Sequence, residues 1–126
     1  VAIRLNNLGE LLRATNRLKE AEPLYRRALE IDEKSYGHDH SNVATDLSNL
    51  AQLLHASNRS AEAEPLMRRV VEILLKFTIA TGYQHPDLRD AIQGYGIILG
   101  ALGRSEDQAF AEINKLMEQY GMRLDS

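Results

Sequence analysis

Apolar residues recur along the chain with the spacing of amphipathic helices. In the first predicted helix they stand at Val1, Leu5, Leu8 and Leu12, which places them on one helix face. A short polar break at 15–17 precedes a second stripe with the same period. Continued along the chain, the pattern predicts helices at about 1–15, 19–35, 41–56, 61–80, 86–101 and 105–120. No turn signal between alternating runs indicates a β-hairpin, so the predicted fold class is all-α.

The chain also repeats itself. The segment Glu-Ala-Glu-Pro-Leu at 20–24 returns at 62–66, a displacement of 42 residues that also carries Asn7 onto Asn49. A weaker third copy follows at a displacement of 45, where His40 corresponds to His85. One helix pair cannot cover its own apolar face, so repeated pairs stack into a superhelix. We therefore predict a single domain at 1–126, with repeats at about 1–41, 42–85 and 86–120 and a tail at 121–126.

The predicted core lies on the apolar stripes that face one another within and between the helix pairs. Small residues stand where the two helices of a pair come closest, at Gly9, Ala51 and Gly96. The expected core residues are Leu5, Leu8, Leu12, Ala21, Leu24, Tyr25, Ala28, Leu47, Leu50, Leu54, Ala63, Leu66, Met67 and Val70.

These residues resemble the tetratricopeptide repeat, whose spacing is followed by Leu5, Leu8, Gly9, Leu12, Ala21, Tyr25 and Ala28. The period of 42 and the Gly-x-x-His linkers at 37–43 and 82–88 are similar, more particularly, to the kinesin-light-chain type, which also occurs in bacterial multi-repeat proteins. The third copy departs from the pattern, as a terminal cap does, because Gly94 replaces the asparagine. The resemblance implies a superhelix of three helix-turn-helix repeats, from the C-terminal part of a longer array, and we expect a cytoplasmic location.

Composition and charge narrow the possible partners. The 126 residues carry 15 basic and 18 acidic side chains, and a net charge of −3 does not favour nucleic-acid binding. Arginines recur at 26–27 and 68–69, but pairs such as Glu22–Arg26 and Glu64–Arg68 account for them, and a nucleic-acid-binding helical repeat is only a minor alternative. The chain has no cysteine, and no apolar run approaches the ~20 residues of a membrane helix. We expect neither a nucleic-acid nor a membrane partner.

Catalytic motifs are absent from the sequence. There is no Gly-x-Ser-x-Gly, P-loop or His-Glu-x-x-His pattern, so we expect neither enzyme activity nor a cofactor. His38, Asp39 and His40 together offer three potential metal ligands. However, His40 and His85 are repeat equivalents in two linkers, which favours a loop or helix-cap role over a metal site.

Polar positions on the first helix of each pair are the candidate binding residues, because the resemblance implies that these helices line a concave groove. Asparagine is a poor helix former, yet Asn7 and Asn49 recur mid-helix in one register, which favours hydrogen bonds to a peptide backbone. Kinesin light chains hold acidic peptides, whereas here Glu10 and Asp90 oppose the clearest cation, Arg13. The predicted peptide-binding residues are Asn6, Asn7, Glu10, Arg13, Ser48, Asn49, Gln52, His55 and Gln93.

The predicted function is a protein–protein interaction scaffold that binds a peptide segment of another protein, or of another domain of the same chain. The alternative is a spacer or oligomerisation module whose groove stays empty. In a longer array the outer face of the first helix, with Val1, Leu11 and either Ile3 or Leu8, packs on a preceding helix. We expect this face to be partly uncovered here and to form a homodimer.

Overall fold

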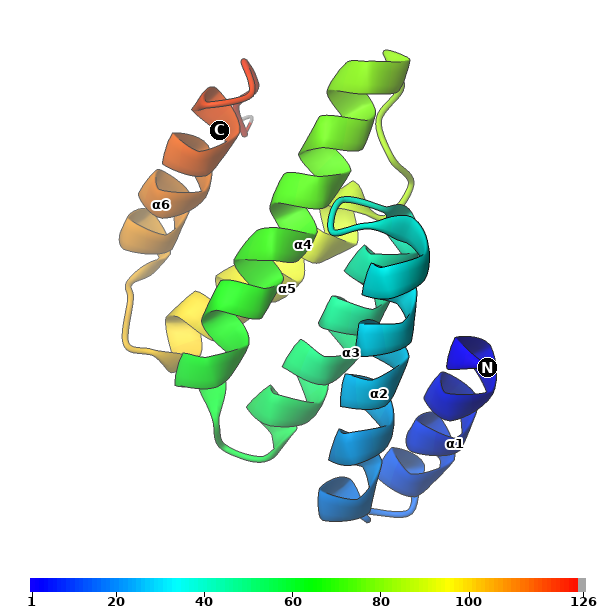
Figure 1. Cartoon of the computed structure of the whole chain (residues 1–126). Coiled ribbons are helices and arrows are strands. Elements are labelled where there is room, and N and C mark those ends of the chain that lie inside the picture. The colour runs from blue at the N-terminus through cyan, green and yellow to red at the C-terminus, as the bar shows by residue number, and fades with distance from the viewer. Residues whose placement is uncertain (125–126) are drawn as a thin grey trace.

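The computed structural model describes residues 1–124, which form six α-helices and no strand (Figure 1). The helices are α1 (Ala2–Ala14), α2 (Leu18–Tyr36), α3 (Ser41–Ala56), α4 (Ser60–Thr81), α5 (Leu88–Ala101) and α6 (Glu106–Glu118). They form three antiparallel pairs that follow one another across the molecule, as tetratricopeptide repeats do in a superhelix (Figure 1). The all-α prediction is confirmed. Helix α5 begins two residues later than predicted because Pro86 lies in the preceding turn, and residues 125–126 of the predicted tail lie outside the described residues.

The turn inside each helix pair has the same backbone conformation. Asn16, Asn58 and Gly103 have φ angles of 63°, 62° and 93°, in the left-handed region. Asparagine and glycine are the residues that enter this region most readily. This constraint explains why glycine replaces asparagine here in the third copy.

Histidine closes the linker between successive pairs. Nδ1 of His40 and Nδ1 of His85 each accept a hydrogen bond at 3.0 Å from the backbone N–H two residues further on. The two rings also pack on an aromatic ring of the preceding helix, with centroid distances of 4.4 Å to Tyr36 and 4.7 Å to Phe77. Both histidines therefore organise the start of a helix, as the sequence pattern predicts.

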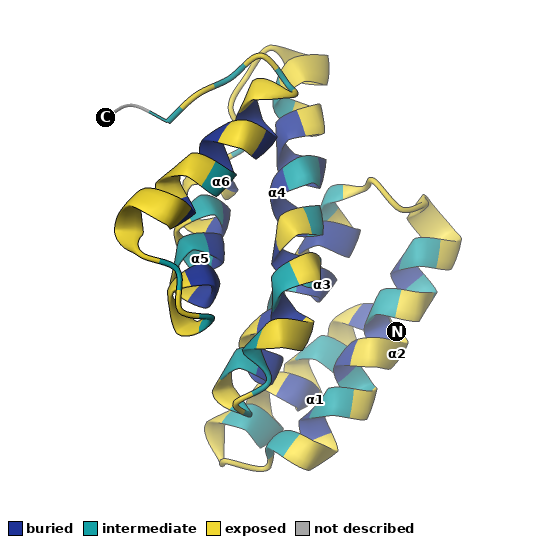
Figure 2. Cartoon of the chain, turned by 90° about the vertical axis from the view of Figure 1, so that its left-hand side faces the viewer, coloured by how far each residue is buried: buried dark blue, intermediate teal, exposed yellow. Residues whose placement is uncertain are grey.

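Burial is concentrated in the middle helix pair, which has a neighbouring pair on each side (Figure 2). Most of the predicted core is buried, including Leu47, Leu50 and Leu54 of α3. Leu8 is 47% exposed, so its assignment to the core is wrong: it lies on a face of α1 that no described helix covers. Some of the predicted core residues are only partly buried, at the margin of the core, namely Leu5, Leu12, Leu24 and Leu66.

The helices of the first pair come closest where Gly9 faces Tyr25. A Cβ atom at Gly9 would lie 2.8 Å from Cε1 of Tyr25, so this contact requires glycine. The ring is fully buried, and its hydroxyl donates a hydrogen bond to Oε1 of Glu10 at 3.0 Å. Burial and this hydrogen bond raise the pKa of Tyr25 to about 12, so the phenol remains a donor at neutral pH.

Replacing Leu50 tests the central position of α3 in the core. Leu50→Ala is expected to lower the free energy of unfolding by about 2–5 kcal/mol, because the side chain is fully buried and its truncation leaves a cavity. Urea denaturation followed by circular dichroism measures the change. The control Ile79→Ala, at an exposed position of α4, should change the free energy by less than about 0.5 kcal/mol. Equal effects of the two substitutions would contradict this packing.

Candidate functional site

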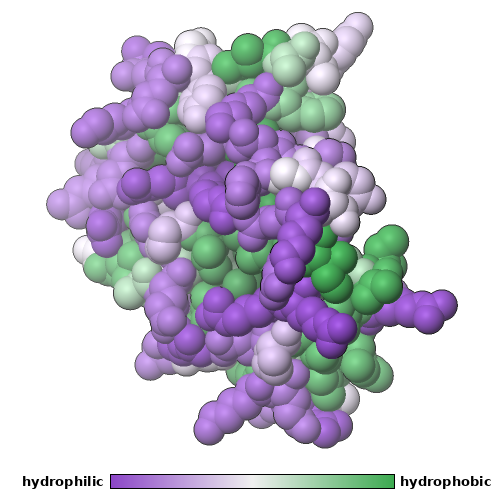
Figure 3. Space-filling view, viewed as in Figure 1, coloured by the Kyte–Doolittle hydropathy of each residue, from purple (hydrophilic) through white to green (hydrophobic). Residues whose placement is uncertain are grey.

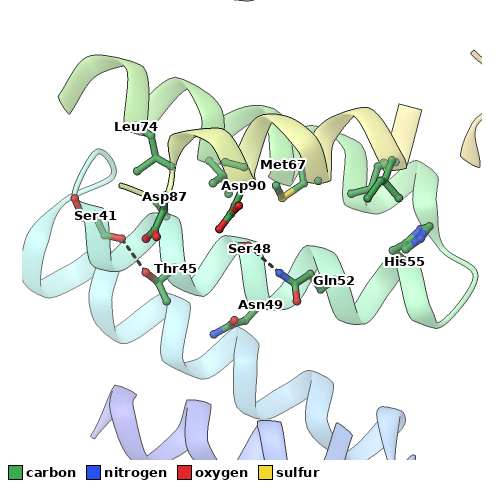
Figure 4. A pocket seen from close by; sticks show the side chains of 16 residues that line it. Ser41, Thr45, Ser48, Asn49, Gln52, His55, Met67, Leu74, Asp87 and Asp90 are labelled. Carbon is green, nitrogen blue, oxygen red and sulfur yellow. Dashed lines mark hydrogen bonds between the residues drawn. The ribbon is translucent and has the colours of Figure 1, made fainter. Parts of the chain in front are cut away.

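A groove of about 410 Å³ lies between α3, α4 and α5 (Figure 4). Its floor is apolar and comes from α4, with Met67, Val70 and Leu74. Helix α5 forms one wall, on which Asp87 and Asp90 are the charged residues. The opposite wall belongs to α3 and is mainly polar, with Ser41, Ala44, Thr45, Ser48, Asn49, Gln52 and His55.

Because Gly94 has no side chain, α5 projects little into the groove at this position. Gly94 occupies the register position at which the first two copies have asparagine, and it lines the groove. A Cβ atom at this position would lie 3.1 Å from Cε of Met67, so the methionine side chain packs directly against the α5 backbone. A longer side chain at Gly94 would occupy the groove itself.

Four of the predicted binding residues line this groove, all on α3. Oγ of Ser48 accepts a hydrogen bond from Nε2 of Gln52 at 3.2 Å, and Nδ1 of His55 lies 2.9 Å from Oγ of Ser60. These contacts hold the polar wall in place. The amide of Asn49 has no side-chain hydrogen bond with any described residue, so both its donor and its acceptor are available to a ligand.

The other predicted residues lie outside the groove. Glu10 and Arg13 form an ion pair at 3.0 Å on α1, so the expected groove cation is neutralised by its neighbour. Asn7 and Gln93 are exposed and do not line the groove. The structure therefore brings together the candidates of the second repeat and separates them from those of the first.

Sequence reasoning missed the floor of the groove as a part of the site. Met67 and Val70 are predicted as core residues, and both are buried. They nevertheless line the groove, because the second helix of a pair contacts both neighbouring first helices. In the sequence, the apolar stripe of α4 indicates packing only. The position of α5 leaves part of this stripe uncovered, and that part forms the floor of the groove.

A buried acidic pair joins the first two helix pairs. Asp46 of α3 is 1% exposed, and Asp32 of α2 is also buried. Nδ2 of Asn6 donates a hydrogen bond to Oδ1 of Asp46 at 2.7 Å, so this predicted binding residue ties α1 to α3 instead. Burial, together with the neighbouring carboxyl group of Asp32, raises the pKa of Asp46 to about 7. Asp46 is therefore protonated in the folded protein below that pH.

This raised pKa makes the stability depend on pH. An unfolded aspartate loses its proton above about pH 4, whereas Asp46 in the folded state keeps it up to about pH 7. Stability should therefore fall as the pH rises from about 4 to about 7, by up to about 1.4 kcal/mol per pH unit.

Asp46→Asn should remove this contribution, so that the variant gains stability over the parent at about pH 8 and differs little at about pH 4. Urea denaturation at several pH values measures the difference. Asp107→Asn, at an exposed position of α6, should retain the parental pH dependence. An unchanged pH dependence in Asp46→Asn would show that the acidic pair is not its source.

The face formed by α2 and α4 is mostly hydrophilic, and hydrophobic atoms gather on the side where α1 lies (Figures 1 and 3). Arg59, directly before α4, bonds Glu22 of α2 at 2.6 Å, and Arg69 of α4 lies 3.5 Å from Glu33. Both predicted pairs within a helix are present, at 3.0 and 3.2 Å: Glu22–Arg26 and Glu64–Arg68. Three of the four recurring arginines, Arg26, Arg68 and Arg69, therefore pair with neighbouring carboxylates on this face.

Within residues 1–124, no three histidine or acidic side chains converge in a way that could hold a metal ion. None of the helices in that range is both long and apolar enough to cross a membrane.

Comparison with protein families agrees with this architecture. Residues 1–76 match the family described as the tetratricopeptide repeat, and because this is more than half of the chain, the protein belongs to that family. Tetratricopeptide repeats are in general protein–protein interaction scaffolds, and the fold is not a catalytic one. No curated protein matches the chain.

Proposed function

We propose that this chain binds a peptide segment of another protein, or of another domain of the same protein, in the groove between α3, α4 and α5. The observation that carries the proposal is an unbonded amide, Asn49, beside an apolar floor formed by Met67 and Leu74. An amide can donate to and accept from a peptide backbone, while an apolar floor buries a side chain of the ligand. Together these features provide register and affinity without catalytic chemistry.

The α3 wall of the groove provides the polar contacts to the ligand in this proposal. Asn49 bonds the ligand backbone, and Ser48, Gln52 and His55 add polar contacts. On α1 and α5, outer contacts extend the binding surface beyond the groove: the exposed residues Asn7 and Gln93 and the ion pair of Glu10 with Arg13. Asn6, which is bonded to Asp46, holds α1 against α3.

We further propose that the chain is one domain with repeats at about 1–41, 42–85 and 86–120, of the kinesin-light-chain type. The period of 42 residues and the histidine caps at His40 and His85 support this subtype. The replacement of asparagine by Gly94 in the last copy supports a position at the C-terminal end of a longer bacterial array, which we place in the cytoplasm.

Filling the groove tests the proposed function. Gly94→Asn places an amide side chain in the groove and is expected to weaken peptide binding at least about tenfold, since the ligand and the new side chain compete for the same space. Fluorescence anisotropy with peptides selected on a random array measures the affinities. The matched control is Gly100→Asn on the same helix, where an added Cβ meets nothing within 4 Å.

The control should bind these peptides as the parent does. If Gly94→Asn binds as tightly as the parent, the groove is not the binding site. If the parent binds no peptide on the array, the spacer function replaces the proposal.

A second proposal concerns the uncovered face of α1. Val1, Ile3, Leu8 and Leu11 are all exposed there and form an apolar surface on one helix. Exposed apolar surfaces of this kind mark interaction sites. We propose that a second copy of the chain covers this surface in a homodimer, an association that is separate from peptide binding in the groove.

Charged substitutions test the homodimer. Light scattering should give twice the monomer mass for the parent and the monomer mass for a variant with Ile3→Lys and Leu11→Lys, because two lysines cannot be buried without partners. The control Ile79→Lys changes an exposed isoleucine on α4 and should leave the dimer intact. A monomeric parent at high concentration would refute the dimer.

A further inference from the structure

We propose that the ligand of the groove is a basic peptide, in which a lysine or arginine stands about three residues from a large apolar side chain. This inference rests on the proposed function, since it assigns the chemistry of the peptide that the groove takes. Binding of such a peptide requires a groove with an acidic end and an apolar end at a fixed distance from each other.

The acidic end is formed by Asp87 and Asp90, in the turn before α5 and in its first helical turn. The side chains of Asp87 and Asp90 lie toward Thr45 and Ser48 of α3, across the groove (Figure 4). Among the described residues that line the groove, none is a lysine or an arginine. Neither aspartate forms an ion pair within residues 1–124, so their charge is not neutralised by the protein.

Acidic residues at a helix start also stabilise the helix dipole, and this effect alone does not define a binding site. Helix α6 has the same feature, with Glu106 and Asp107 in its first turn, yet neither lines the groove. What distinguishes the α5 pair is the cavity beside it, because a concave surface with low-dielectric walls concentrates the field of its charges. The apolar floor and the unpaired negative charges of Asp87 and Asp90 together favour a peptide that carries both a basic and an apolar side chain.

The apolar end lies farther along α5, where Ile97 and Ile98 line the groove beside His55 of α3. Asp90 and Ile97 are seven positions apart, which corresponds to about 10 Å along an α-helix. A peptide in the polyproline II conformation rises about 3.1 Å per residue with about three residues per turn. It therefore covers that distance in about three residues and presents side chains three positions apart on the same side. A bound peptide can therefore place a basic side chain at Asp90 and an apolar side chain at Ile97 when the two are about three positions apart.

The face formed by α2 and α4 provides a contrast within the same molecule. There, Glu22 and Glu33 bind Arg59 and Arg69, so the surface neutralises itself. At the groove, by contrast, the carboxylates of Asp87 and Asp90 lie beside an open apolar surface. For this reason we assign the basic ligand to the groove and not to the helix face that carries more charges.

Three sets of synthetic peptides of about 12 residues test the inference with the full chain. The first carries Arg-x-x-Leu, the second Glu-x-x-Leu and the third Arg-x-x-Ser, with alanine, serine and glycine at the other positions. Fluorescence anisotropy should show the first set binding about tenfold more tightly than either of the others. This advantage over the glutamate set should shrink as the salt concentration rises from about 50 mM to about 500 mM, because exposed charges are screened.

Matched variants locate the effect at α5. Asp87→Asn with Asp90→Asn should weaken binding of the Arg-x-x-Leu set about three- to tenfold, the range for two partly exposed ion pairs. Glu106→Gln with Asp107→Asn removes the same charge from the start of α6 and should leave the affinity unchanged. Circular dichroism melting of both variants shows whether either substitution merely unfolds its helix.

The outcomes separate this inference from the proposed function. If glutamate peptides bind as tightly as arginine peptides, or the α5 variant binds like the parent, the basic ligand is refuted. If in that case Gly94→Asn still weakens the peptides that bind, the groove function stands without it. If no peptide of any charge binds the parent, the proposed function fails, and this inference fails with it.

Discussion

The packing of α3 against α4 is the interaction on which the rest of the structure depends. Leu47, Leu50 and Leu54 of α3 are buried, and α4 contributes a second buried stripe from Ala63 to Leu75. A helix pair cannot bury both of its faces alone, so only a pair with neighbours on each side reaches full burial. The first pair docks on one side of this core and the last pair on the other, and the groove lies where α5 meets it.

The groove depends on the choice of small residues as much as on the large ones. Glycine at position 9 lets Tyr25 pack directly under α1, and glycine at position 94 lets Met67 pack directly under α5. At the first contact the ring of Tyr25 is fully buried, so this contact stabilises the helix pair and leaves no surface for a ligand. The second leaves the apolar floor open beside α3, because at Gly94 no side chain fills the space that asparagine occupies in the other copies.

Docking of the first helix pair on the middle pair includes polar contacts as well as apolar ones. Asn6 bonds Asp46, and Asp46 in turn lies beside Asp32, so three polar side chains meet within the otherwise apolar contact between pairs. Burial is the main cause of the raised pKa of Asp46, and the neighbouring carboxyl group of Asp32 raises it further, because burying two charges of the same sign side by side is unfavourable. The contact between the first and second repeats is therefore sensitive to protonation, whereas the apolar packing of α3 on α4 is not.

The sequence by itself determined the helices, their pairing and the repeat. The 3.6-residue period, the displacement of 42 and the special residues Asn16, Asn58 and Gly103 all act over short distances along the chain, so they can be read directly. The polar wall of α3 was also predictable, because Ser48, Asn49, Gln52 and His55 lie off the apolar stripe of their own helix.

Only the tertiary structure decided which polar residues remain free. Asn6 and Asn49 both lie on the polar side of their helices, yet one is bonded to Asp46 from the next repeat and the other faces an open groove. Leu8 follows the same stripe as Leu50, yet it is exposed because no described helix packs on that face of α1. Helix periodicity gives the side of a helix on which a residue lies, but the neighbour that covers that side comes from residues about 40 positions away, and its placement depends on the packing of the whole molecule.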